Sequence, residues 1–298
     1  MTTGKGIIQT GQAEIAYESS GSGEAGVIIL IRGQGTQLIH WPDSFYEVFS
    51  THGFRTIRFD NRDTGLSEKF DHIAGRELEI LKRRIAAGEE IDPPYTIDDM
   101  AQDVIALMDG LDIDTAHIVG ISMGGFIAQV LAADYPSRVL SMTSIMSGSR
   151  SIDPALIDTL WSTPRSREVF IREWIEYIRQ FGSEKYFEGD DDSRRIAAAA
   201  FDRCYSPEGA NRQLLAICSM KDTRNRIRTI SIPTLVVHGA GDLLIPPTMG
   251  RETADLIPGA AFKLVGGMGH DIPPGLGTSL AEIVLEHIQS ITNVSTET

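Results

Sequence analysis

The chain has 298 residues, 42% of them hydrophobic and 23% charged, which suits one large α/β domain with an insertion as well as two average domains. Its formal net charge of −14 repels the phosphates of nucleic acids, so we expect no nucleic-acid partner. No apolar signal-peptide segment follows Met1, and the best apolar run, Val27–Ile31, is far too short to cross a bilayer, so we expect a cytoplasmic protein with no membrane partner.

Short apolar runs along the chain predict a β-sheet. The first two, residues 7–8 and 13–17, are separated by residues 10–12 and are typical of a β-hairpin. The next run, Val27–Ile31, is apolar throughout, as expected for a strand that is covered on both faces. Similar runs recur at residues 56–59, 117–119, 142–146, 234–237 and 262–265.

Helical patterns separate these runs. Thr96 and Asp99 have the spacing of a capping box at the start of one of the helices. Alternation of buried strands with helices predicts a mostly parallel sheet with right-handed crossovers. The predicted helices cover residues 43–49, 96–107, 123–134, 252–256 and 280–288.

Two stretches interrupt this alternation. Residues 68–94 are highly charged and are predicted to be helical. Residues 147–226 contain amphipathic helical windows but no convincing strand. We interpret residues 147–226 as a helical cap over a core that is formed by residues 1–146 and 227–298.

The predicted cap has two notable features of composition. Its acidic run, residues 190–192, is predicted to be a solvated loop. It is not expected to bind calcium, because it lacks the spaced ligands and the glycine of a calcium-binding loop. Its aromatic residues fit the cap's own core and an apolar pocket equally well. These aromatic residues are Trp161, Phe170, Trp174, Tyr177, Phe181, Phe187, Phe201 and Tyr205.

The sequence around Ser122 predicts a nucleophile. Residues 117–125 run from a buried strand directly into a helix and contain the motif G-x-S-x-G, with Gly120 and Gly124 on either side of Ser122. The motif holds a serine on a strained turn, where a Cβ on either glycine would clash with the packed backbone. The serine hydroxyl is then exposed at the N-terminus of a helix, whose amides favour developing negative charge.

A serine hydroxyl needs a base that accepts its proton, and in this type of site the chain order is serine, acid, histidine. His238 ends a strand and is expected to be a packed structural residue, whereas His287, in the terminal helix, is expected at the surface. His270 follows a strand within the glycine-rich turn at residues 266–270. We therefore predict that His270 is the catalytic base.

Asp242 is the predicted acid of the triad. It follows the strand at residues 234–237, so its carboxylate emerges at the carboxyl end of that strand, where open α/β sheets place their sites. The alternative acid is Asp153, which lies near the end of the earlier strand at residues 142–146.

The tetrahedral intermediate of acyl transfer needs two amide donors that point at its oxygen. The backbone N–H of Met123, directly after the nucleophile, is one predicted donor. The loop after Val27–Ile31 reads Arg32-Gly33-Gln34-Gly35, and we predict that the backbone N–H of Gln34 is the other.

With these residues in place, the chain resembles the capped α/β-hydrolases along nearly its whole length, and most of all the group that contains aclacinomycin methylesterase. The resemblance implies an α/β-hydrolase fold, with a mostly parallel eight-stranded sheet flanked by helices and a helical cap inserted after strand 6. It also implies hydrolysis of carboxylic esters, with the triad and oxyanion roles given above. The shared landmarks are residues 32–35 with Trp41 downstream, residues 59–67, the turn at Ser122, residues 232–234, 241–242 and 267–270.

Arg32 departs from the family pattern, because the related enzymes more often have histidine at this position. We expect Arg32 to form a structural ion pair with Asp60 or Asp63, and contact with a carboxyl or carbonyl group of the substrate is the alternative. Trp41 is expected to be a core anchor.

The leading interpretation is a serine carboxylesterase that cleaves an ester of a small hydrophobic or aromatic molecule through an acyl-enzyme. C–C bond hydrolases and perhydrolases with the same triad are alternatives, as is a ligand-binding receptor on a hydrolase fold. We expect no cofactor and no metal. Cys204 and Cys218 have no neighbour at redox-motif or zinc-ligand spacing and are expected to be free thiols.

Overall fold

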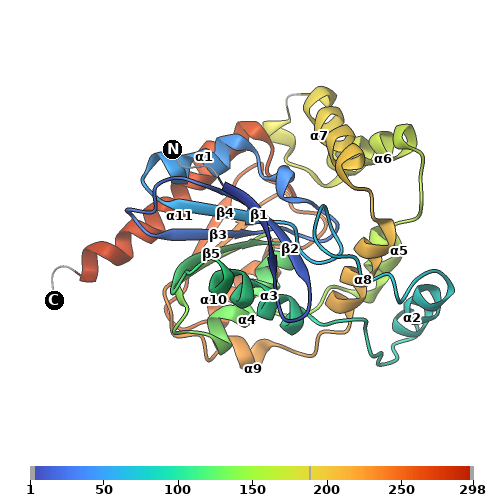
Figure 1. Cartoon of the computed structure of the whole chain (residues 1–298), viewed down its shortest axis with the longest axis horizontal. Coiled ribbons are helices and arrows are strands. Elements are labelled where there is room, and N and C mark those ends of the chain that lie inside the picture. The colour runs from blue at the N-terminus through green and yellow to red at the C-terminus, as the bar shows by residue number, and fades with distance from the viewer. Residues whose placement is uncertain (1–3, 188, 296–298) are drawn as a thin grey trace.

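The computed structural model describes residues 4–187 and 189–295, which form an eight-stranded sheet with helices on both faces (Figure 1). The strand order is β1-β2-β4-β3-β5-β6-β7-β8. The pairs β1–β2 and β2–β4 are antiparallel and the other five are parallel, which confirms the mostly parallel sheet and the opening hairpin. The strands are β1 (Gly4–Gln9), β2 (Glu14–Ser20), β3 (Val27–Ile31), β4 (Arg55–Phe59), β5 (Ala116–Ile121), β6 (Val139–Ile145), β7 (Thr234–Gly239) and β8 (Ala261–Val265).

The central strands are apolar on both faces, so helices pack against both faces of the sheet. In β3, Ile28 and Leu30 point into one hydrophobic cluster and Ile29 and Ile31 into the other. The helices α1 and α11 pack together over the first cluster, and α3 and α4 over the second. The helices of this part are α1 (Asp43–Thr51), α2 (Arg76–Ala86), α3 (Ile97–Gly110), α4 (Met123–Asp134), α10 (Pro247–Leu256) and α11 (Pro274–Ser295).

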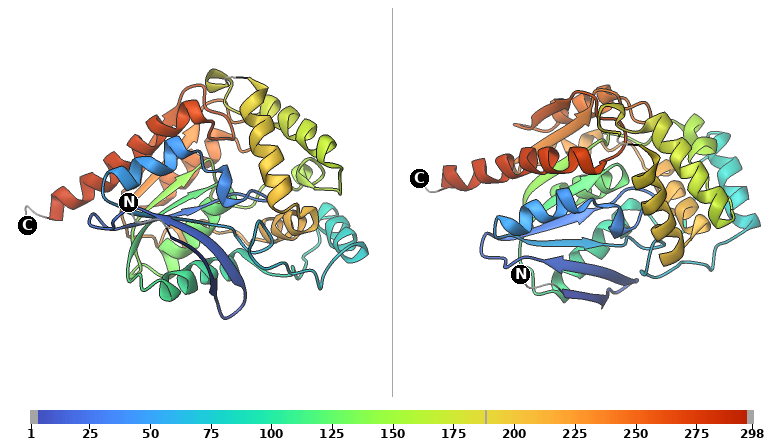
Figure 2. Two further views of the ribbon diagram at one scale, coloured as in Figure 1. Left: turned by 45° about the horizontal axis from the view of Figure 1, so that its top comes forward. Right: turned by 90° about the horizontal axis from the view of Figure 1, so that it is seen from above.

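The chain between β6 and β7 is helical, and no strand occurs among the described residues of 147–226. Figure 2 shows the helices between residues 157 and 218 gathered with α2 at one end of the sheet, whereas the helix Arg224–Ile227 packs against α4 and α10. In the described part of the chain, no helix has both the length and the apolarity that crossing a membrane requires. The helices of this segment are α5 (Ile157–Leu160), α6 (Arg167–Phe181), α7 (Asp190–Arg203), α8 (Pro207–Cys218) and α9 (Arg224–Ile227), with short 3₁₀ turns at Pro154–Leu156 and Glu184–Tyr186.

The acidic run at residues 190–192 is helical, so our expectation of a solvated loop there is wrong. The three aspartates form the first turn of α7. Negative charge is favourable at a helix N-terminus because the free amides there carry partial positive charge. Asp190 also forms an ion pair with Arg179 of α6, at 2.6 Å between Oδ2 and Nη2. The run therefore starts a helix and ties it to its neighbour.

Two arginines from residues 147–226, the segment predicted to be a cap and called the cap segment below, pair with the carboxylates that we expected to pair with Arg32. That expectation is wrong. Arg203 lies 2.7 Å from Oδ2 of Asp60, and Arg212 lies 2.8 Å from Oδ1 of Asp63. Arg212 and Asp63 are both fully buried. Because α7 and α8 supply the arginines and the loop after β4 supplies the aspartates, these pairs fasten residues 147–226 to the sheet.

Candidate active site

Ser122 lies on a sharp turn between β5 and α4. Its backbone angles are φ 52° and ψ −119°, a conformation that costs energy for a residue with a side chain. The turn is held from both sides: the Ser122 N–H donates to the carbonyl of Ile145 at 2.9 Å, and its own carbonyl accepts from Gly125 N–H at 2.9 Å. The strain is thus supported by the neighbouring strand and by the first turn of the helix.

The glycines of the motif are required by close backbone contact, as the sequence predicts. A Cβ on Gly120 would overlap the carbonyl oxygen of Gly124, and a Cβ on Gly124 would overlap that of Ile31. Neither oxygen can move away easily, because both belong to the main chain of the sheet and its connecting helix. The packing that exposes the Ser122 side chain therefore depends on these two glycines.

His270 links Ser122 to Asp242. Its Nε2 lies 3.0 Å from Ser122 Oγ, and its Nδ1 lies 2.8 Å from Asp242 Oδ2. A carboxylate only accepts hydrogen bonds, so Nδ1 carries the proton and Nε2 is free to accept one from the serine hydroxyl. The backbone N–H of His270 also donates to the carbonyl of Phe181, at the end of α6, which fixes the turn that carries the imidazole.

Asp242 is held in place by hydrogen bonds to both of its carboxylate oxygens. Oδ1 accepts the backbone N–H groups of Leu244 and Ile245, each at 2.9 Å. Burial by itself would raise the pKa of Asp242, but the charge interaction with His270 and hydrogen bonds from His238, His270 and the Ile245 amide outweigh it and hold that pKa below its usual range. Asp242 therefore stays ionised beside His270.

The rival acid does not reach this cluster. Asp153 is exposed, and its Oδ1 accepts the backbone N–H of Ala155 in a local turn. The strand that we expected to carry it, β6, contributes instead the carbonyl that binds Ser122 N–H. Of the two candidate acids, only Asp242 contacts His270 in the described structure.

His238 contacts the site, which the sequence analysis did not foresee. It is fully buried, as expected, but its Nε2 lies 3.4 Å from Asp242 Oδ2 and 2.9 Å from the carbonyl of Ile245. The sequence signal for this contact was the spacing of four residues between His238 and Asp242. His287 is half-buried rather than exposed at the surface, and burial lowers its pKa.

The residues of both predicted oxyanion donors line the cavity that contains Ser122. Met123 is the first residue of α4, where backbone N–H groups have no acceptor within the helix. Gly33 packs against Ser122, since a Cβ built on it would lie 3.1 Å from that of Ser122. The Gln34 side chain donates to the carbonyls of Leu160 and Ala210. Among the residues described, the backbone N–H of Gln34 has no acceptor.

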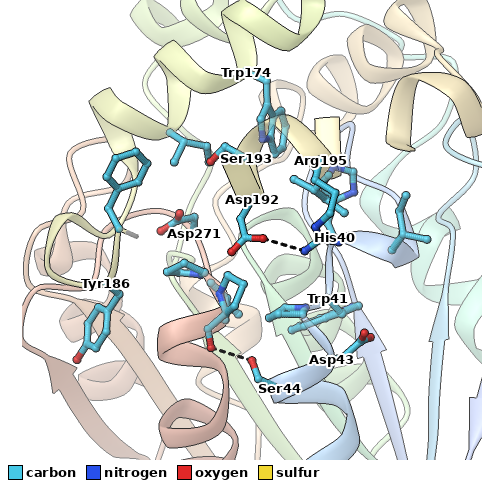
Figure 3. Close-up of a pocket in the computed structure, with 18 of the residues that line it drawn as sticks. His40, Trp41, Asp43, Ser44, Trp174, Tyr186, Asp192, Ser193, Arg195 and Asp271 are labelled. Atoms are coloured by element: carbon cyan, nitrogen blue, oxygen red, sulfur yellow. Dashed lines mark hydrogen bonds and ion pairs between the residues drawn. The ribbon is translucent and has the colours of Figure 1, made fainter. Parts of the chain in front are cut away.

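Two cavities meet beneath the helices of the cap segment. The larger, about 340 Å³, contains Ser122 and His270. The smaller, about 270 Å³, lies between α6, α7 and the loop that carries Trp41, and Figure 3 shows Trp174 on its cap side and Trp41 on its core side. Aromatic residues of the cap segment that line the larger cavity are Trp161, Phe170, Trp174, Tyr177 and Tyr205.

The aromatic residues of the cap segment serve both of the purposes that the sequence left open. Phe181 is buried in the main hydrophobic cluster, and Phe201 stacks on Tyr205 with ring centroids 4.6 Å apart.

Trp41, in the core, is 1% exposed and stacks on Phe45, which confirms it as a core anchor. Cys204 and Cys218 are both free thiols, as expected.

Comparison with known proteins gives a consistent result along the chain. A family model described as alpha/beta hydrolase fold matches residues 26–273. Rhodomycin D methylesterase DnrP from Streptomyces peucetius is 26% identical over 307 aligned residues, which cover 94% of this chain and 97% of that protein.

Solved structures agree with this chain in fold. The enol-lactonase from Burkholderia xenovorans LB400 superimposes with a TM-score of 0.76 at 25% identity, covering 95% of this chain and all of that one. A thermophilic esterase from Thermogutta terrifontis superimposes with a TM-score of 0.74 at 22% identity, covering 97% and 99% of the two chains.

Proposed function

The chain belongs to the α/β-hydrolase family, and from that premise we propose that it is a serine carboxylesterase whose triad is Ser122, Asp242 and His270. The observation that carries the proposal is the position of His270, within hydrogen-bond distance of both Ser122 Oγ and Asp242 Oδ2. The esterase assignment also draws support from a relative that is a rhodomycin D methylesterase. Residues 147–226 are proposed to act as the cap over this site.

In the first half of the reaction, Ser122 Oγ attacks the ester carbonyl while His270 Nε2 takes the hydroxyl proton. Asp242 keeps Nδ1 protonated and stabilises the imidazolium that forms. Negative charge develops on the carbonyl oxygen, and we assign its stabilisation to the backbone N–H groups of Gln34 and Met123. His270 then passes its proton to the leaving alcohol, and the acyl group remains on Ser122.

In the second half, a water molecule replaces the alcohol. His270 Nε2 accepts a proton from this water as its oxygen attacks the acyl carbonyl, and the same two amides bind the oxyanion again. Collapse of the intermediate breaks the bond to Ser122 Oγ, which regains its proton from His270. The products are a carboxylic acid and the resting enzyme.

The larger cavity favours a small apolar or aromatic ester as substrate. Its volume of about 340 Å³ is close to the lower end of the range for ligand pockets, roughly 300–1,000 Å³. Apolar side chains from α4 and the cap segment, among them Phe126, Leu160 and Ile217, line the cavity that contains Ser122. Such a wall suits an acyl or alcohol group without charge on the side that contacts it.

The test is hydrolysis of p-nitrophenyl esters from acetate to dodecanoate, with Ser122→Ala as the matched variant. We expect a burst of p-nitrophenol followed by steady turnover, with the rate falling toward dodecanoate because the long chain exceeds the cavity. Ser122→Ala should keep the wild-type fold and lose both the burst and the turnover. Equal rates in the two proteins, or no reaction with any chain length, would argue against the proposal.

A further inference from the structure

Arg32 lines the same cavity as the proposed nucleophile and forms no ion pair with a carboxylate among the residues described. It follows the last residue of β3, and the next residue, Gly33, packs against Ser122. The Arg32 side chain is 8% exposed. In the described part of the chain, no carboxylate oxygen lies within 4.0 Å of its guanidinium, because Asp60 and Asp63 are taken by Arg203 and Arg212.

The contacts that Arg32 does make leave much of its guanidinium unused. Nε donates to Thr36 Oγ1 at 3.3 Å, and the guanidinium carbon lies 5.0 Å above the centre of the Trp41 ring. A buried cation gains from an aromatic face, but that contact supplies no hydrogen-bond acceptor. Among the residues described, Nη1 is buried and has no hydrogen-bond partner at all.

A second buried donor lies in the wall of the same space. The indole Nε1 of Trp174, on α6, is also buried without a hydrogen-bond partner among the described residues. Arg32 and Trp174 each line both the larger and the smaller cavity, so both lie where the two cavities meet. Two unsatisfied N–H donors in one wall are costly unless a ligand supplies acceptors.

The charged and titratable neighbours Asp271 and His40 do not supply the hydrogen-bond acceptor that Arg32 Nη1 lacks. Asp271 lines both cavities, and its Oδ1 accepts the backbone N–H of Ser183 at 2.7 Å. Its negative charge raises the pKa of Arg32, but burial outweighs that effect and lowers the pKa to about 9, so Arg32 is charged at neutral pH. His40 is neutral, because burial and the charge of Arg32 lower its pKa to about 3.

An ionised carboxylate matches this arrangement best. It accepts hydrogen bonds and donates none, so it can bind Nη1 and the indole N–H together. A neutral carbonyl would accept the same bonds but would add no negative charge to that of Asp271, which does not offset the burial of Arg32. The apolar wall around Ser122 lies in the larger cavity, so the acid group has room toward the smaller one.

We propose that Arg32 and Trp174 bind a free carboxylate on the substrate, so that the enzyme acts on esters of molecules that also carry an acid group. The inference rests on the proposed esterase function and narrows its substrate class. Arg32 is the specificity-determining residue, and Trp174 supplies the second hydrogen bond.

The test compares esters that differ only in the acid group. The probes are the monomethyl esters of succinate, glutarate and adipate, with methyl butanoate, pentanoate and hexanoate as neutral partners of equal acyl carbon number. Wild type is compared with Arg32→Met, Arg32→Lys and Arg165→Met. Arg165 also lines the larger cavity but already pairs with Glu173 at 2.9 Å, so it is the matched control.

We expect Arg32→Met to lower kcat/KM for the best monomethyl ester by about 10- to 150-fold, the loss of one charged hydrogen-bonded contact. Its kcat/KM for the neutral partner should change by less than about 3-fold, and Arg32→Lys should fall in between because a lysine keeps the charge without the planar fork. Arg165→Met should leave the ratio of the two substrates unchanged.

Binding to the Ser122→Ala variant, measured by calorimetry with monomethyl glutarate, separates this inference from the esterase function. Binding that is lost on adding Arg32→Met supports the carboxylate site even if wild type shows no turnover, a result that would count against the esterase alone. Turnover of methyl pentanoate with no preference for monomethyl esters, and no effect of Arg32→Met on the ratio, would overturn the carboxylate site and leave the esterase standing. Absence of both turnover and binding would overturn both.

Discussion

His238 Nε2 lies 3.4 Å from Asp242 Oδ2, the same oxygen that binds His270 Nδ1 at 2.8 Å. Because the other carboxylate oxygen accepts two backbone amides, all the polar contacts of Asp242 point to an ionised side chain. His238 Nε2 also lies 2.9 Å from the carbonyl of Ile245, so this nitrogen carries the proton. His238 therefore acts on His270 through the acid, as a positioning residue.

Replacing His238 should reduce turnover without changing substrate binding. In His238→Leu, Asp242 loses one donor and is held less firmly, so we expect kcat to fall by about 10-fold with KM unchanged, equivalent to a hydrogen bond worth about 1.4 kcal/mol. His238→Gln, which keeps a donor near the position of Nε2, should recover most of the rate. Steady-state kinetics of the two variants measure this difference. Equal losses of kcat would contradict the positioning role and would mean that His238 contributes only packing.

The pH dependence of stability should report on His117. Burial, and to a lesser degree the charge of His287, lower the pKa of His117 to about 4. Unfolded histidine takes up a proton below about pH 6.5, so between pH 6.5 and pH 4 the unfolded state binds more protons than the folded state. The free energy of unfolding must therefore fall as the pH drops through this window.

For His117 alone, the expected loss between pH 7 and pH 5 is about 2 kcal/mol. Urea unfolding at these two pH values, in wild type and in His117→Gln, measures it. The amide of glutamine can keep a hydrogen bond to Ser141 Oγ, which lies 2.8 Å from His117 Nδ1. From pH 7 to pH 5, the free energy of unfolding of the variant should fall by about 2 kcal/mol less than that of wild type. An identical loss in both proteins would contradict the assignment of the proton to His117.

The buried pair Arg212–Asp63 should be expensive to break. Arg212→Met leaves a fully buried carboxylate without its cation, so we expect the free energy of unfolding to fall by about 3–5 kcal/mol. The double variant Arg212→Met/Asp63→Leu should recover part of this loss, because it removes the orphaned charge. Arg179→Met, which breaks an exposed ion pair in the same segment, is the control and should cost less than about 1 kcal/mol. Chemical denaturation of the three variants would refute the argument if Arg212→Met cost no more than Arg179→Met.

Gly124→Ala should damage stability and activity together. The added Cβ would lie 2.2 Å from the carbonyl oxygen of Ile31, so the main chain must shift by about 1 Å to restore van der Waals contact. We expect a cost of about 1–3 kcal/mol, as for other overpacked sites, and a lower kcat because Gly33 and Gln34 follow that strand. Gly11→Ala is the control, since nothing lies within 4 Å of its added Cβ. If both variants unfold at the same denaturant concentration, the close contact at Gly124 is not what requires glycine.

The sequence predicted best those features that depend on neighbouring residues. Short apolar runs located the strands, and the helical patterns between them located the main helices. The motif around Ser122 predicted the turn because the strand, the glycines and the helix are all local signals. The order of the triad then reduced the choice of base to three histidines, and position after a strand reduced the choice of acid to two aspartates. The geometry of the triad still depends on the fold, since 148 positions separate Ser122 from His270.

Features decided by competition between distant residues were not predictable in this way. Asp60 and Asp63 follow β4, the parallel neighbour of β3, and so were reasonable partners for Arg32, but Arg203 and Arg212 of the cap segment pair with both carboxylates. Residues 190–192 were weighed only as a solvated loop or a calcium-binding loop, and the preference for acidic residues in the first turn of a helix, which explains their position in α7, was not considered.

The most direct test of the central claim is covalent trapping of the nucleophile with a fluorophosphonate. The reagent transfers its phosphonyl group to an activated serine with loss of fluoride, and intact-protein mass spectrometry followed by peptide mapping locates the adduct. We predict one adduct per chain, on Ser122, formed rapidly by wild type and not by Ser122→Ala, with His270→Ala reacting far more slowly. Labelling of another serine, or equal labelling of wild type and His270→Ala, would contradict a serine activated by His270.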